Sequence, residues 1–208
     1  MNLSLIKTFP TSYLGTPSDL TFDGKFFYIN HVGTKIGKYD QDFNLISNFL
    51  VPLYNEGITF DGKFFYVSDY TYKIIRKYDY NFNLIKTSSA LGHDCRGLHF
   101  DGKFLYVCEY YNSTTGKYPA IAHKYDLDFK LIKNHTTIYA WCYGITSFRK
   151  GYFVTDLWGY RVFLYDFDFN LIDYSTGLGY KSAGIFYDGK FLYVCDVTNL
   201  KTKKYLVG

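Results

Sequence analysis

The chain has few proline, cysteine, methionine and glutamine residues, and several classes of segment are missing altogether. Four prolines, four cysteines, one methionine and one glutamine occur among 208 residues. No run of 18 apolar residues is present, so no membrane insertion is expected. The net charge of +4 is small and evenly spread, which argues against nucleic acid as a partner. Residues 1–10 lack a basic segment followed by an apolar stretch, so no signal peptide is predicted, and we expect a virion or a host cytoplasm as the location.

Sequence motifs for catalysis and metal binding are also missing. The sequence contains no HExxH motif, no CxxC pair, no GxSxG motif, no P-loop and no dinucleotide fingerprint. We therefore assign no catalytic residue and expect no metal and no cofactor. His99 and His123 fall within expected strands, where packing is the expected role.

Aromatic residues, by contrast, are abundant. They make up 22% of the chain, with 24 tyrosines and 20 phenylalanines, which favours strands over helices. Few Ala and Gln beside many Tyr, Ile and Lys suggest an AT-rich, thermophilic source.

Three short motifs recur along the chain. Segment 22–29, Phe-Asp-Gly-Lys-Phe-Phe-Tyr-Ile, returns at 60–67, 100–107 and 187–194, and in a degraded form at 148–154. A Lys-Tyr-Asp-like motif follows each copy, and then a Phe-Asn-Leu-Ile-like motif follows the first four. The missing fifth copy of the last motif is matched by residues 2–7.

This repeat predicts an all-β fold, a five-bladed β-propeller with four antiparallel strands per blade. Asp-Gly pairs mark the tight turns between the first two strands of each blade. Residues 3–9 are expected to pair beside 201–207 and to complete the last blade, closing the ring. Residues 1–208 then form a single domain. The expected blades are about 17–50, 56–88, 96–137, 143–175, and 183–208 together with 2–9.

Residues 57–69, Gly-Ile-Thr-Phe-Asp-Gly-Lys-Phe-Phe-Tyr-Val-Ser-Asp, resemble the NHL and YVTN-type propeller repeats. The resemblance implies a propeller but no particular activity, because propellers host binding, scaffolding and catalysis alike. The small, Tyr-rich chain is also similar to the tail adaptor of spindle-shaped archaeal viruses. That second resemblance implies structural proteins as partners, in a multi-copy ring.

The loops divide the propeller into two faces. The turns from first to second and from third to fourth strand are nearly the same in every repeat, and we call their side the uniform face. The other connections differ in length and content, and we call their side the variable face. Loops that recognise a partner are free to diverge, so the binding site is expected there, near the channel mouth. The expected binding residues are Glu56, His93, Asp94, Arg96, Tyr110, Tyr111, Trp141 and Tyr143.

Four carboxylates end the second strand of a blade, at Asp69, Glu109, Asp156 and Asp196. We expect each to accept hydrogen bonds from backbone N–H groups of the following turn. A ring of carboxylates that binds a metal is the alternative.

The four cysteines follow the repeat. Cys95 and Cys142 occupy equivalent positions in neighbouring blades, so a disulfide between them is an open alternative. Cys108 and Cys195 lie in second strands and are expected to be buried thiols.

The sequence favours a non-enzymatic protein–protein interaction scaffold, a structural adaptor of a virion or similar assembly. Exposed aromatic residues of the variable face would then be its anchors. One alternative is a lectin-like ligand-binding propeller. Another is a propeller enzyme that uses His93, Asp94, Glu109 or Arg96 at the channel mouth.

Overall fold

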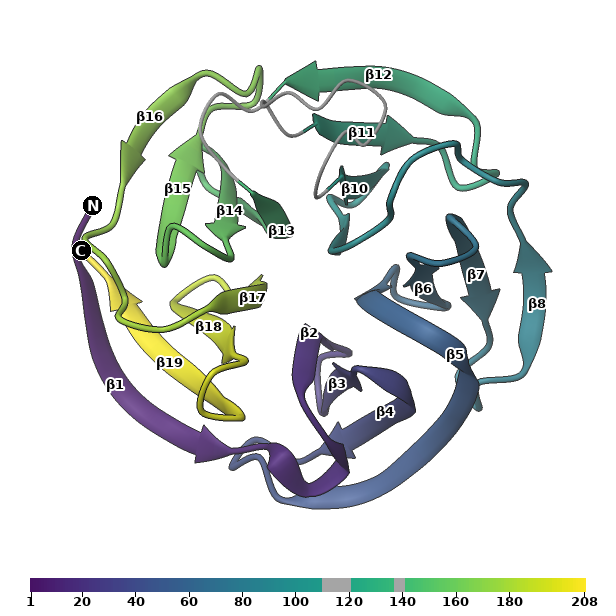
Figure 1. Ribbon diagram of the computed structural model, residues 1–208, viewed down its shortest axis with the longest axis horizontal. Coiled ribbons are helices and arrows are strands. Elements are labelled where there is room, and N and C mark those ends of the chain that lie inside the picture. Colours follow the sequence, from purple (N-terminus) through teal and green to yellow (C-terminus); the bar gives the residue numbers. More distant parts are fainter. Residues whose placement is uncertain (110–120, 137–140) are drawn as a thin grey trace.

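The computed structural model describes residues 1–109, 121–136 and 141–208, and it confirms the all-β propeller. Figure 1 shows its sheets arranged radially around a central axis, with both chain ends side by side on the rim. Apart from the short 3-10 turn η1 (Ser12–Leu14), the regular structure of the described residues consists of strands. None of these residues belongs to a helix with the length and hydropathy of a membrane span.

Three sheets of the ring have four strands each. They run in the orders β12-β11-β10-β9, β13-β14-β15-β16 and β1-β19-β18-β17. The strands of the first sheet are β9 (Leu98–Phe100), β10 (Leu105–Glu109), β11 (Ile121–Tyr125) and β12 (Leu131–Thr136). The second contains β13 (Cys142–Phe148), β14 (Gly151–Asp156), β15 (Arg161–Tyr165) and β16 (Leu171–Tyr174). The third contains β17 (Ser182–Tyr187), β18 (Phe191–Asp196), β19 (Lys201–Val207) and β1 (Leu3–Pro10).

The fourth sheet has seven strands, from β2 to β8 in chain order. These are β2 (Pro17–Phe22), β3 (Phe27–His31), β4 (Gly33–Tyr39), β5 (Leu45–Phe60), β6 (Phe65–Asp69), β7 (Ile74–Tyr78) and β8 (Leu84–Thr87). The 16-residue strand β5 pairs with β4 along its first part and with β6 along its last part. We divide this sheet at β5, which serves as the outer strand of one blade and the inner strand of the next.

The first strand closes the ring as predicted. Strand β1 pairs antiparallel with β19, from Leu3 opposite Val207 to Pro10 opposite Lys201. The Phe9 ring packs against the neighbouring blade and stacks on the Phe43 ring, with 4.3 Å between the ring centroids. Both chain termini therefore contribute to one sheet.

The turns of the uniform face explain why the motifs repeat. In the Asp-Gly hairpin of the second blade, Asp61 Oδ1 accepts hydrogen bonds from the backbone N–H groups of Lys63 (2.8 Å) and Phe64 (2.6 Å). At the next turn Asp79 Oδ1 accepts two N–H groups in the same way. Phe82 within that turn has φ +60°, a left-handed conformation that is uncommon for a residue with a side chain. Its ring is buried and stacks on Phe65 at 4.6 Å, and this packing offsets the backbone strain.

The inner strands approach one another closely at the axis, and this explains the glycine that opens most repeats. A Cβ on Gly97 would lie 2.2 Å from the carbonyl oxygen of Tyr143 in the next blade. Equivalent clashes with backbone atoms exist at Gly57, Gly144 and Gly184, so a side chain does not fit at these positions. The first blade is different, because Asp19 stands where the other blades have glycine.

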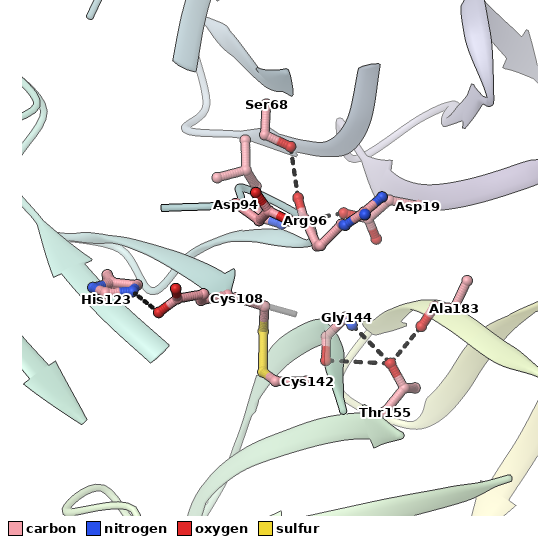
Figure 2. Close-up of a disulfide and its surroundings, with 12 residues drawn as sticks. Asp19, Ser68, Asp94, Arg96, Cys108, His123, Cys142, Gly144, Thr155 and Ala183 are labelled. Carbon is pink, nitrogen blue, oxygen red and sulfur yellow. Dashed lines mark hydrogen bonds and ion pairs between the residues drawn. A yellow bond between two sulfur atoms is a disulfide. The ribbon is translucent and has the colours of Figure 1, made fainter. Parts of the chain in front are cut away.

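The disulfide pairing differs from the expected one. Cys108 of β10 is bonded to Cys142 of β13 in the next blade, with 5.6 Å between the Cα atoms (Figure 2). Cys95 and Cys195 are free and buried. The alternative of a Cys95–Cys142 bond and the expectation that Cys108 is a free thiol are therefore wrong.

The residues that occupy the position of Cys108 in other blades explain the observed pairing. The equivalent positions of Cys95 and Cys142 do not. Ser68, at the position of Cys108 in its own blade, accepts a hydrogen bond from Gly57 N–H and donates one to the carbonyl of Arg96. Thr155 likewise bonds to Gly144 and to Ala183 of the next blade (Figure 2). This position of the second strand connects neighbouring blades, and in the third blade the connection is covalent.

Candidate functional site

Three of the predicted site residues meet at the axis. Glu56, Arg96 and Tyr143 each stand immediately before the axial glycine of an inner strand, in β5, before β9 and in β13 respectively. Inner strands start on the variable face, because the Asp-Gly hairpin that follows each of them lies on the uniform face. We call these three residues the axial cluster.

The hydrogen bonds of the axial cluster converge on the Glu56 carboxylate. Arg96 Nη1 donates to Glu56 Oε1 at 2.9 Å, and the Tyr143 hydroxyl donates to Oε2. The Arg96 guanidinium also lies over the Tyr70 ring, 4.3 Å from its centroid. Glu56 is almost completely buried, with 5% of its side chain exposed, whereas 16% of the Arg96 side chain is exposed. Residues from three blades thus enclose one carboxylate and leave the guanidinium partly open to solvent.

Burial determines the electrostatics of the axial cluster. Loss of solvent raises the pKa of Glu56 above its usual value, although the Arg96 charge and the hydrogen bond from Tyr143 oppose this. Burial and the neighbouring Glu56 carboxylate raise the pKa of Tyr143 well above its usual range. A carboxyl group with a raised pKa exchanges its proton more readily near neutral pH, which suits general acid–base chemistry.

Asp19 lies beside this cluster on the axis and satisfies backbone donors of several blades. Its Oδ2 accepts from Ile58 N–H at 3.0 Å and from Leu98 N–H at 3.3 Å, and its Oδ1 accepts from Leu20 N–H at 2.9 Å. The residue is completely buried, and burial raises its pKa in spite of these hydrogen bonds. Asp19 therefore places a buried carboxyl group at the centre of the ring, where it accepts hydrogen bonds from several blades.

A second polar cluster lies on the variable side of the third blade. His93, Glu109 and His123 each offer one ligand atom, and these atoms all lie within 4.8 Å of one another. His123 Nε2 lies 3.0 Å from Glu109 Oε2, and the His93 and His123 rings stack at 3.6 Å with 7° between their planes. Burial, with the nearby His123, lowers the pKa of His93 to about 4, so its imidazole is neutral near neutral pH. Two imidazoles and one carboxylate form a donor set that is able to hold a divalent metal ion.

The other predicted residues do not join the axial cluster. His93 and Asp94 form no acid–base pair, because His93 Nδ1 faces the backbone carbonyl of Asp94 (3.2 Å), while the Asp94 carboxylate lies 3.6 Å from Lys73 Nζ. Trp141 contacts the edge of Trp158 instead, with 6.4 Å between ring centroids. Tyr110 and Tyr111 lie outside the described residues.

Three of the carboxylates at the strand ends, Asp69, Asp156 and Asp196, each accept backbone N–H groups of the following turn, as expected. The turn after Glu109 lies outside the described residues. Glu109 faces His123, and so His123 has a polar partner in addition to its packing role. His99 is buried and bonds to Ser147, consistent with the expected packing role.

Sequence reasoning named Glu56 and Glu109 as candidates but missed Asp19, and the composition and the repeat mark all three residues. The chain has only two glutamates, Glu56 and Glu109, and each is the carboxylate of one buried polar cluster. Asp19 is the only carboxylate at the axial position that is otherwise glycine. Departures from the repeat therefore mark the buried polar clusters better than the repeated residues do.

Comparison with known proteins supports the fold and widens the range of functions. No protein-family model matches the sequence, and no curated protein sequence matches it significantly. The glutaminyl cyclase of Myxococcus xanthus has a similar structure, with a TM-score of 0.83 and 10% identity, covering 99% of this chain and 97% of that one. Hydrazine synthase of Kuenenia stuttgartiensis follows with a TM-score of 0.62 and 14% identity, over 92% and 84% of the two chains. A chain of a nidogen–laminin complex has a TM-score of 0.61 and 16% identity, over 84% and 69%.

These neighbours correct the expectation that the chain is not an enzyme. The fold is shared over nearly the whole length of the chain with a glutaminyl cyclase, which is an enzyme, and it also occurs in a chain of a hydrazine synthase structure. The nidogen–laminin complex shows that related propellers also serve in protein interaction. At 10–16% identity the similarity shows a common fold, so the function has to be argued from the site.

Proposed function

We propose that the chain is an enzyme whose active site is the axial cluster, with Glu56 as the general acid–base. The observation that carries this proposal is the convergence of Arg96 and Tyr143 on one buried carboxylate at the axis. Arg96 and Tyr143 each use one lone pair of a different carboxylate oxygen, so each oxygen keeps a second lone pair for a substrate proton. The partly exposed Arg96 guanidinium is the group that a substrate oxygen meets first.

For the reaction class we propose cyclisation of a glutaminyl residue at the start of a peptide, the activity in the name of one structural neighbour. In this reaction the α-amine nitrogen attacks the side-chain amide carbon, a C–N bond forms, and the bond to the amide nitrogen breaks to release ammonia. Glu56 would accept a proton from the attacking amine and return it to the leaving ammonia. Arg96 would stabilise the negative charge that develops on the amide oxygen.

The test is a comparison of three chains on a peptide that begins with glutamine, followed by ammonia release and mass spectrometry. We expect the wild type to exceed the spontaneous rate and Glu56→Gln to lose about 100-fold or more of that activity. Asp168→Asn, on the uniform face, is the control and should match the wild type. A wild-type rate equal to the spontaneous one would overturn the cyclase proposal, and an unchanged Glu56→Gln rate would remove Glu56 from the mechanism.

The interaction role and the virion adaptor stay predictions from composition. No contact among the described residues bears on them.

A further inference from the structure

An ion pair is repeated where the second and third strands of a blade meet the variable face. Arg76 of β7 pairs with Asp69 at 2.8 Å, and Lys203 of β19 pairs with Asp196 at 2.9 Å. Arg76 is paired across the strands with Val67, which lies two residues before Asp69. Lys203 is paired in the same way with Val194, two residues before Asp196. In these two blades the third strand supplies a long cationic side chain that neutralises the buried carboxylate at the end of the second strand. We take this as the structural role of the pair.

The third blade departs from this pattern at the same position. His123 lies opposite Val107, two residues before Glu109, so this pair replaces Asp69–Arg76 and Asp196–Lys203. Compared with the other two pairs, the basic side chain, His123, is shorter, and the acidic side chain, Glu109, is longer. A third group is added, because the connection between β8 and β9 places the His93 ring directly on the His123 ring. Glu109 and His123 are each 5% exposed, and His93 is half-buried, so the cluster is accessible only from the side of His93.

The outer hydrogen bonds orient both imidazoles. His93 Nδ1 faces the carbonyl of Asp94 and so carries the proton, while Nε2 accepts from the Tyr125 hydroxyl at 2.7 Å. Because this ring is stacked parallel to that of His123, it has to turn out of the stack and release Tyr125 before Nε2 can bind an ion shared with His123. His123 Nδ1 lies 2.8 Å from Asn134 Oδ1. If Nδ1 carries the proton and donates to Asn134, the lone pair of His123 Nε2 faces the Glu109 carboxylate. The ring nitrogen and the carboxylate oxygen are then both acceptors, and their close contact requires a cation between them. A proton fills this place in a simple ion pair, and a metal ion fills it in a binding site.

We propose that His93, Glu109 and His123 bind one divalent transition-metal ion, with zinc as the ion that suits them best. Two imidazole nitrogens and one carboxylate oxygen match zinc, whereas calcium and magnesium prefer oxygen ligands throughout. Ligands at about 2.0 Å in a tetrahedral site lie roughly 3.3 Å apart. The 3.0 Å separation of His123 Nε2 and Glu109 Oε2 is close to this value. Three protein ligands leave a fourth position for water or a ligand, and this site is independent of the acid–base role of Glu56.

The test titrates the intact, oxidised chain with Zn²⁺ alone by calorimetry and records the absorption spectrum with Co²⁺. We expect one ion per chain and a cobalt spectrum of low coordination number with nitrogen and oxygen ligands. His123→Gln and the conservative Glu109→Gln should each weaken Zn²⁺ binding by roughly 100-fold or more, beyond the effect of losing an outer partner. His135→Gln, a buried histidine of the same blade, is the matched control and should bind as the wild type does.

Three results would overturn the proposal. The first is a wild-type chain that binds no stoichiometric Zn²⁺. The second is binding that is equal in the wild type and in both cluster variants. The third is a thiolate-to-cobalt charge-transfer band, because it would place the ion on the free thiol of Cys95 or Cys195. Since the wild-type titration does not depend on any variant folding, the proposal remains testable even where a substitution destabilises the chain.

Discussion

The Oδ2 atom of Asp19 accepts a 3.0 Å hydrogen bond from the backbone N–H of Ile58, a residue of the next blade. The same carboxylate accepts N–H groups of Leu98 and Leu20. One side chain therefore satisfies donors of three blades at the point where the ring is narrowest. In the other blades glycine stands at this position, so the centre of the propeller depends on a single substitution in the repeat.

Replacing Asp19 with asparagine should destabilise the ring. The amide nitrogen of the variant cannot accept a hydrogen bond, so at least one buried N–H donor loses its partner, at a cost of about 1–3 kcal/mol. Urea unfolding followed by tyrosine fluorescence measures this change. Asp168→Asn, which alters an exposed turn, is the control, and equal unfolding midpoints for the two variants would contradict the role assigned to Asp19.

Removal of the first nine residues should lower stability severely. The deletion takes away nearly all of β1, exposes the edge of β19, and removes the Phe9 ring that stacks on Phe43. An open sheet edge also invites pairing between chains. We expect a much lower melting temperature and a tendency to aggregate. A truncated chain that melts at the same temperature as the intact chain would show that the ring is not closed by this strand.

Reduction of the Cys108–Cys142 disulfide should cost about 2–4 kcal/mol, as for other bonds that close loops of intermediate length. Cys108→Ser should be insensitive to reducing agent. It should also be more stable than Cys108→Ala, because Ser68 shows that a serine at this position bridges neighbouring blades. Thermal melts with and without reductant compare the three chains. Equal stability of the serine and alanine variants would contradict the bridging role.

Acid should destabilise the chain through His99. Burial lowers the pKa of His99 to about 4, and Ser147 N–H donates to its Nε2 at 3.0 Å, so the folded chain holds this imidazole neutral. In the unfolded chain its pKa is about 6.5. The stabilisation is therefore complete above about pH 6.5 and is lost as the pH falls toward 4, by up to about 3 kcal/mol.

The variant His99→Gln isolates this contribution. Its free energy of unfolding should decrease less than that of the wild type between about pH 7 and pH 4. His31, whose pKa burial also lowers to about 4, is unchanged in both chains, so its effect cancels in the comparison. Parallel pH profiles for the two chains would show that His99 does not contribute.

The sequence predicted the features that the repeat carries. Strand positions, the Asp-Gly turns and the pairing of residues 3–9 with β19 follow from motifs that return along the chain. Glu56, Arg96 and Tyr143 could also be predicted as neighbours, because each precedes the first glycine of a blade and the inner strands meet at the axis.

Contacts that join different positions of the repeat could not be predicted in this way. The Cys108–Cys142 bond links a second strand to the inner strand of the next blade, and only the relative position of the two blades brings these sulfurs together. His93 reaches His123 through a connection whose path no motif specifies. Both contacts depend on packing between blades, which periodicity alone does not encode.

We propose that Glu56 is a buried carboxyl group able to exchange its proton near neutral pH. Because Glu56 and Glu109 are the only glutamates, a chain labelled with ¹³C at the glutamate carboxyl carbon gives two signals, and Glu109→Gln assigns them. The Glu56 signal should titrate with a pKa above the usual glutamate value and should shift when a peptide that begins with glutamine is added. A Glu56 signal that titrates at or below the usual value, and does not respond to the peptide, would contradict it.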